Sequence, residues 1–193
     1  MKNPKLLVWG GFFGAIIVVL IIVGVPYLKD ENKMAELGKI YTSWTVAEGK
    51  VTQFQARFPK EPEYASQDLP IPDSDQVMRQ EIYVGGDEDM SYFVSATLYP
   101  AEVSGDEEEN LRQALDGMAK SIPEGEIISS SYMVPVSGAN YLEYKIHSNA
   151  NNLSYKGRLF LSSRSLYQVY ISFPEAAYND DKYTFFANSF EIK

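Results

Sequence analysis

The sequence begins with an apolar run that is long enough to cross a lipid bilayer. Residues 6–28 contain no charged side chain. As an α-helix, these 23 residues span roughly 34 Å at about 1.5 Å each, and the hydrocarbon core of a bilayer is about 30 Å thick. A helix also satisfies its own backbone hydrogen bonds inside lipid. We therefore predict a tail and single-pass transmembrane helix over residues 1–28, in contact with membrane lipid through residues 6–28.

Other interpretations of this run fit less well. A cleavable signal peptide has a shorter apolar core and a small-residue cleavage site of the A-x-A type, which is missing here. A lipoprotein needs a cysteine after the run, and the sequence has none. A buried soluble helix is rarely so long and apolar on every face. The short tail is typical of a signal-anchor, so we expect the following domain on the extracytoplasmic side. Lysines flank both ends of the run, so this orientation stays open.

Gly10 and Gly14 lie one helical turn apart inside the apolar run. Small residues at this spacing let two helix backbones approach closely, so the two glycines are a candidate helix-pairing site for a homodimer. Ordinary use of glycine in an apolar helix is the simpler explanation.

The rest of the chain is acidic and has few reactive side chains. Lys2 and Lys5 are the charged residues of positions 1–28, so residues 29–193 carry −11, two units more negative than the −9 of the whole chain. An acidic domain repels phosphate backbones, so we expect no nucleic-acid binding. The absence of cysteine excludes disulfides, thiolate chemistry and cysteine metal sites.

Hydrophobic periodicity predicts one α+β domain over residues 44–193, after a juxtamembrane helix or linker at residues 29–43. An apolar stripe ending at Ile122 predicts a helix, with Ser104 and Glu107 as its capping box. A closing helix is expected over residues 175–188, and a long loop over the Pro- and Asp-rich residues 60–75. Alternating residues predict strands at 52–58 and 90–99. The turn residues that separate the other segments predict strands at 77–84, 126–134, 140–148, 153–162 and 166–173. Hairpin-length connections then give an antiparallel sheet with helices packed on its faces.

No combination of residues predicts an enzyme. His147 is the single histidine and shares its strand parity with Glu143 and Lys145, which favours a solvated side chain over a catalytic base. The serines at 129–131 lie in a predicted strand and not in a nucleophile elbow. Acidic clusters at 73–75, 87–89 and 106–109 lack the spacing of a calcium loop, although calcium remains open. We expect no catalytic residue, no cofactor and no metal site.

Several short motifs resemble a known family. These are Phe54-Gln-Ala-Arg-Phe58-Pro59-Lys-Glu-Pro62, the strand that begins Tyr92-Phe-Val-Ser, and the ending Phe185-Phe186-Ala-Asn-Ser189-Phe190-Glu-Ile192. Residues 41–193 resemble the small exported bacterial proteins with the PsbP-like fold, which are related to an extrinsic subunit of photosystem II and to a Ran-binding nuclear transport factor. The resemblance implies an α/β/α sandwich around an antiparallel sheet, no enzymatic activity, and docking on a larger assembly. A transmembrane anchor departs from many relatives, which speaks against a photosystem role.

These features together predict a membrane-anchored, non-catalytic binding or accessory protein. Its extracytoplasmic domain would dock on a partner protein or a membrane complex. The alternative is a small-ligand or ion-binding domain in the cell envelope, which a well-formed pocket with converging polar groups would support. A hydrolase built on two facing carboxylates is the least favoured hypothesis.

Overall fold

The computed structural model describes residues 43–71, 74–136 and 138–193. The predicted transmembrane helix over residues 6–28, the candidate pairing residues Gly10 and Gly14, and nearly all of the juxtamembrane segment lie outside the described residues. Among the residues that are described, no helix is long and apolar enough to cross a membrane.

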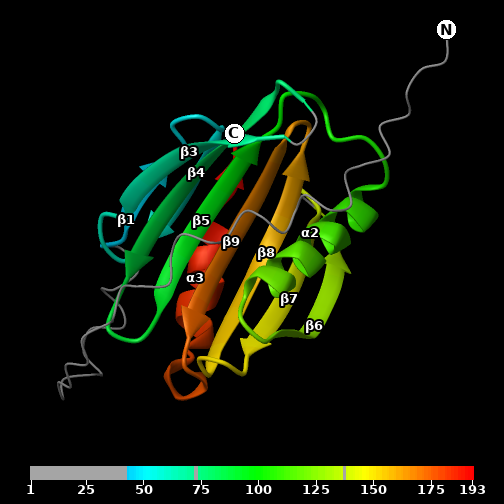
Figure 1. Cartoon of the computed structure of the whole chain (residues 1–193). Coiled ribbons are helices and arrows are strands. Elements are labelled where there is room, and N and C mark those ends of the chain that lie inside the picture. The colour runs from blue at the N-terminus through cyan, green and yellow to red at the C-terminus, as the bar shows by residue number, and fades with distance from the viewer. Residues whose placement is uncertain (1–42, 72–73, 137) are drawn as a thin grey trace, which may run out of the picture.

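A seven-stranded antiparallel sheet forms the centre of the molecule (Figure 1). Its four C-terminal strands follow one another as a meander, and β4 and β5 form a hairpin, as predicted. The hairpin joins the meander through the pairing of β5 with β9, which the sequence did not predict. From edge to edge the strands are β3 (Glu63–Pro70), β4 (Val77–Gly86), β5 (Ser91–Leu98), β9 (Ser165–Phe173), β8 (Leu153–Ser162), β7 (Tyr141–Ser148) and β6 (Gly125–Met133).

A second, three-stranded sheet packs with the large one. Its central strand is β2 (Phe54–Phe58), which pairs antiparallel with β1 (Thr45–Glu48) and with β10 (Glu191–Ile192). Helix α3 (Asp180–Ser189) precedes β10 and follows a short 3-10 helix, η2 (Glu175–Ala177).

The large sheet buries a separate hydrophobic core on each face. On one face, helix α2 (Glu107–Ser121) packs Leu111, Leu115 and Met118 against strands of the meander. On the other face, Phe54 of the small sheet and Phe186 of α3 belong to an aromatic-rich core. Figure 1 shows α2 and α3 on opposite sides of the large sheet.

The predicted fold class, α+β with helices packed on the sheet faces as an α/β/α sandwich, is wrong. The protein is mostly β: 49% of the described residues lie in strands, which form two sheets, against two α-helices. The small sheet covers part of the face that the prediction assigned to helices. Its outer strands are four and two residues long, too short to reveal a period of two in the sequence.

Two local predictions also fail, for identifiable reasons. The expected loop at residues 60–75 contains β3, which pairs with β4 over all of its residues. Charged side chains and prolines are tolerated at a sheet edge, so an edge strand can resemble a loop in sequence. The helix cap is Asp106, whose side chain accepts the backbone N–H of Glu109, and not Ser104.

Candidate functional site

Strand β6 is an edge of the large sheet, and it is unusually free of charge. The sequence has no charged side chain between Glu126 and Asn140. Of the six large hydrophobic side chains that the described residues expose, four lie on β6 or just after it: Ile128, Met133, Val134 and Val136. Exposed edge strands offer unpaired backbone N–H and C=O groups, and natural proteins normally block them with charges or prolines. The hydrophobic side chains of β6 therefore mark it as a candidate binding edge.

The other edges of the two sheets have the usual protection. Strand β3 carries Glu63 and Asp68, and Asp68 lies 3.8 Å from Arg79 of the neighbouring strand. Prolines flank or end β3 at positions 62 and 70. The outer strands of the small sheet are too short to offer an extended edge. Among the described edge strands, β6 alone combines length with an uncharged stretch, which runs from Ile127 to its end at Met133.

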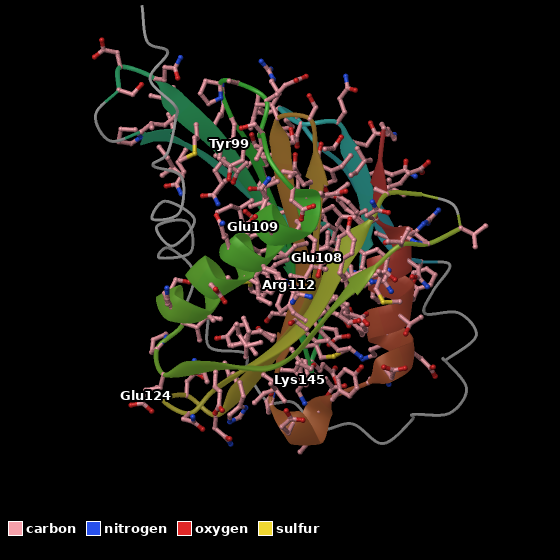
Figure 2. All side chains as sticks on the ribbon, turned by 90° about the vertical axis from the view of Figure 1, so that its right-hand side faces the viewer. Tyr99, Glu108, Glu109, Arg112, Glu124 and Lys145 are labelled. Atoms are coloured by element: carbon pink, nitrogen blue, oxygen red, sulfur yellow. The ribbon has the colours of Figure 1, made fainter. Side chains whose placement is uncertain are left out.

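A bulge at Ile128 sets which side chains of β6 face each side of the sheet. The register shifts between Ile127 and Ser129, and regular pairing with β7 continues from there. Ser130 then lies on the α2 side, with its hydroxyl 3.4 Å from Nη1 of Arg112. Ser129 and Ser131 share the opposite face with their partners Lys145 and Glu143. Figure 2 looks onto this edge, with α2 on one side of the sheet and α3 on the other.

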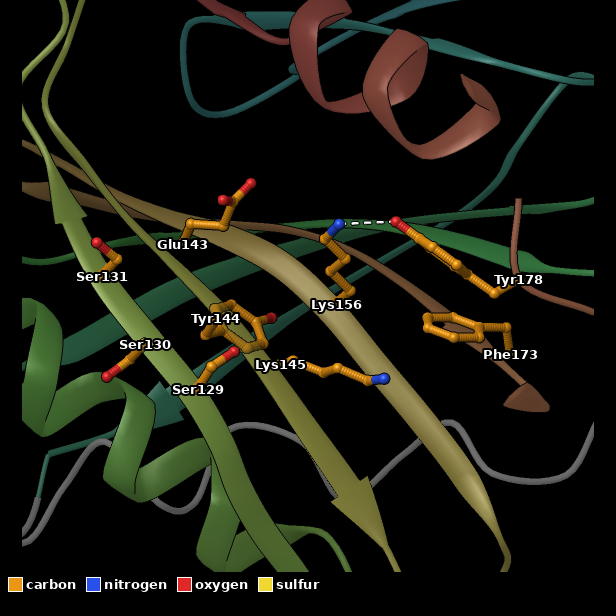
Figure 3. A pocket seen from close by; sticks show the side chains of 9 residues that line it. All are labelled: Ser129, Ser130, Ser131, Glu143, Tyr144, Lys145, Lys156, Phe173 and Tyr178. Carbon is orange, nitrogen blue, oxygen red and sulfur yellow. Dashed lines mark hydrogen bonds between the residues drawn. The ribbon is translucent and has the colours of Figure 1, made fainter. Parts of the chain in front are cut away.

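A hollow of about 350 Å³ lies beside β6, on the face away from α2. Its polar side chains come from neighbouring strands and from the segment after β9, as Figure 3 shows. The residues that line it are Ser129, Ser130, Ser131, Glu143, Tyr144, Lys145, Lys156, Phe173 and Tyr178.

Two lysines lie directly opposite each other in this hollow. Lys145 of β7 pairs in register with Lys156 of β8, an arrangement that is destabilising because like charges on paired strands repel. Each lysine has an acidic partner on the segment after β9. Lys145 Nζ lies 2.8 Å from Glu175, and Lys156 Nζ lies 3.3 Å from Asp180.

The carboxylates around the hollow are stabilised in their charged form. The hydrogen bond from Lys145, together with that from Ser154, lowers the pKa of Glu175. The hydrogen bonds from Tyr178 and Lys156 lower the pKa of Asp180. Burial, with the nearby Asp180 charge, raises the pKa of Tyr178, whose hydroxyl also accepts a hydrogen bond from Lys156 at 2.7 Å. At neutral pH the two carboxylates that pair with the lysines are therefore charged, and both lie on the segment after β9, away from β6.

Glu143 lines the hollow but is engaged by other groups. Its carboxylate accepts the hydroxyl of Tyr183 at 3.0 Å and lies 3.6 Å from Nε of Arg158. The guanidinium of Arg158 in turn stacks 4.7 Å from the ring of Tyr141. These contacts fix Glu143 and leave the row that contains Ser129 and Lys145 without a carboxylate on the β6 side.

His147 does lie on the polar face of β7, as its parity predicted, and is half-buried. Its Nδ1 lies 3.1 Å from the hydroxyl of Ser154, which donates to the carboxylate of Glu175. The serine therefore lies between the histidine and the acid. In a nucleophilic triad the histidine lies between the acid and the serine, because it must accept the serine proton.

Two of the three predicted acidic clusters serve structural contacts, and Asp73 of the third, at 73–75, lies outside the described residues. Asp87 and Asp89 bind Nζ of Lys182 at 2.8 and 3.4 Å. Burial raises the pKa of Asp87, but hydrogen bonds from Lys182 and from backbone amides outweigh burial and lower it overall. The cluster at 106–109 caps and begins α2. Within the described part of the chain, no group of three or more acidic or histidine side chains could hold a metal ion.

Sequence reasoning missed both the open edge and the lysine pair. The uncharged stretch after Glu126 is visible in the sequence and could have marked β6. The pairing of Lys145 with Lys156 depends on strand register, which no pattern in the sequence shows.

Comparison with known proteins adds no relative. No family model matches the chain, and no curated protein sequence matches it. The resemblance to PsbP-like proteins stays a prediction.

Proposed function

We propose that this chain is a membrane-anchored, non-catalytic binding protein whose folded domain takes up an extended segment of a partner protein along β6. The observation that supports this proposal is the open edge itself: a nine-residue strand without a charged side chain after Glu126, with exposed Ile128, Met133 and Val134. Such an edge either binds another strand or is a site of aggregation.

Addition of a partner strand would use both the backbone edge of β6 and the hollow beside it. Backbone hydrogen bonds to β6 provide affinity for any extended segment, and alternate side chains of that segment select the sequence. On one face of the sheet, these side chains would meet the hollow beside Ser129 and Ser131. On the other face they would meet the surface near Ser130 and Arg112.

The arrangement of His147, Ser154 and Glu175 supports binding over catalysis. The hydroxyl of Ser154 is fully buried and donates its proton to Glu175, so it does not point at a substrate. A nucleophile must reach the substrate and have its base within hydrogen-bond distance.

The apolar run at residues 6–28 supports a position at a membrane surface, on the extracytoplasmic side. Protease added to intact cells should degrade the folded domain, and the remaining fragment should stay in the membrane after alkaline extraction. A domain that is degraded only after the cells are opened would contradict this orientation.

Strand addition is tested with the full chain in mild detergent and a displayed library of random ten-residue peptides. We expect selected peptides to lose binding to the double variant Ile128→Lys/Val134→Lys, because lysines on an edge strand oppose addition of another strand. Val77→Lys is the matched control, since Val77 is also an exposed valine but lies at the start of β4. Hydrogen exchange should show new protection of backbone amides in β6 when a peptide is bound.

Three results would contradict the proposal. The library could yield no binder, the binders could keep their affinity for the double variant, or protection could appear away from β6. A dimer that forms without peptide and is lost in the double variant would assign the edge to a second copy of the chain instead. Thermal unfolding of each variant controls for loss of the fold.

A further inference from the structure

The geometry points to an acidic side chain on the segment that adds to β6: we infer that its carboxylate enters the hollow and binds the ammonium group of Lys145. This inference rests on the proposed strand addition. It specifies the type of partner side chain that binds in the hollow.

The position of the acidic residue follows from the pleat of the sheet. On the hollow side, one cross-strand row runs from Ser129 through Lys145 to Lys156. A strand added to β6 would extend this row by one residue, next to Ser129. Neighbouring strands lie about 4.8 Å apart, so this residue and Lys145 would be roughly 10 Å apart at their backbones. Two long side chains can meet across that distance because the serine between them is small.

The charges in the row favour an acid at that position. Lys145 faces Lys156 directly, and the carboxylate partners of both lysines lie on the segment after β9. On the β6 side the row contains only the hydroxyl of Ser129. An ammonium group has three donors, and the contact with Glu175 occupies one of them. A carboxylate arriving from β6 would accept from Lys145 and from the serine hydroxyl.

The rest of the domain restricts what else the segment can carry. Residues 29–193 have a formal charge of −11, so a strongly acidic peptide is repelled at long range. Two glutamates lie in the adjacent rows on this face: Glu143, which is already bound by Tyr183 and Arg158, and the exposed Glu126 of β6, which pairs with His147 and adds to the repulsion of a second acid. The site therefore fits one acidic residue in a segment that is otherwise neutral or basic.

A glutamate scan of a neutral library-selected peptide tests this inference. Glutamate and glutamine are placed at each position in turn, and dissociation constants are measured with the full chain. We expect one position at which glutamate binds about tenfold more tightly than glutamine, the usual size of a charge-assisted hydrogen bond. That preference should vanish in Lys145→Met and persist in Lys145→Arg, while the glutamine peptide binds all three proteins equally. Lys60→Met, at an exposed lysine outside the hollow, should retain the preference.

The inference is overturned if glutamate improves peptide affinity at no position, or improves it as much in Lys145→Met as in the unchanged protein. If binding still depends on Ile128 and Val134 in that case, strand addition to β6 is supported although the partner needs no acidic residue. Free glutarate provides the last comparison. If it binds as tightly as the glutamate peptide, the hollow is a site for small anions and the inference fails.

Discussion

Glu81 is a fully buried carboxylate that is bound by the backbone of the turn between β1 and β2. It accepts the N–H groups of Lys50, Val51 and Thr52 at 2.9, 3.1 and 2.8 Å. The hydroxyl of Thr52 donates to it as well. One side chain of the large sheet thus holds the turn that leads into the small sheet.

Replacing Glu81 with glutamine should destabilise the protein by about 2–4 kcal/mol, because a charged acceptor is lost and buried N–H groups lose their partner. Urea unfolding measures the change. Glu61→Gln, at an exposed site, is the control and should have little effect. A loss below about 0.5 kcal/mol for Glu81→Gln would contradict this view of the turn.

Gly157 permits close contact between three strands of the meander. A Cβ atom at this position would lie 2.4 Å from Cβ of Tyr170 and 2.8 Å from the hydroxyl of Tyr144. We expect Gly157→Ala to lower the free energy of unfolding by about 1–3 kcal/mol, the range for overpacked cores. In Gly86→Ala, also in a strand, the nearest atom would be 3.6 Å away, and the change should be close to zero. Equal effects from the two substitutions would contradict the packing around Gly157.

At the scale of elements, two residues are candidates for the N-cap of α2: Asp106, which caps the helix in the structure, and Ser104, which the sequence predicted. Asp106→Ala should cost about 1 kcal/mol, because the side chain of the N-cap residue satisfies a backbone N–H group that has no helical partner. Ser104→Ala should be neutral, since the Ser104 side chain does not cap the helix. Thermal unfolding of both variants distinguishes the cap in the structure from the one that the sequence predicted. A larger loss for Ser104→Ala would contradict the structure.

The elements that could be predicted are those whose pattern is long and regular. The meander and the hairpin β4–β5 consist of strands of eight or more residues, and short turns leave little choice of partner. Strand β3 was missed because its charged residues and prolines are also those of a loop. The edge position of β6, and with it the binding site, depends on the order of strands in the sheet. That order is set by tertiary packing and not by local sequence.

At the scale of the whole molecule, the number of buried tyrosines sets the alkaline limit of stability. Burial raises the pKa of six of them: Tyr83, Tyr99, Tyr144, Tyr167, Tyr170 and Tyr183. Their folded pKa values lie above the unfolded value of about 10, so their contribution is complete below that pH and is lost as the pH rises beyond it.

We therefore expect a cooperative unfolding transition above about pH 10, in which tyrosine ionisation and loss of β-sheet signal coincide. Absorbance at the tyrosinate band and circular dichroism, recorded on the same samples, measure the two processes. The chain in concentrated urea provides the reference titration. Tyrosines that all ionise near their unfolded pKa while the sheet stays intact would contradict this prediction.

The pairing of β10 with β2 also has a consequence for synthesis. Gln55 and Glu191 are neighbours in the small sheet although 136 positions separate them in the chain. At about 5–20 residues per second, a ribosome needs on the order of 10 s to make that interval. Throughout this time Phe54 and Phe58 lack Phe186 and Phe190, which pack with them in the finished core. Each newly made chain thus presents an uncovered aromatic strand for seconds, and a factor that shields apolar segments during translation should increase the yield of folded protein.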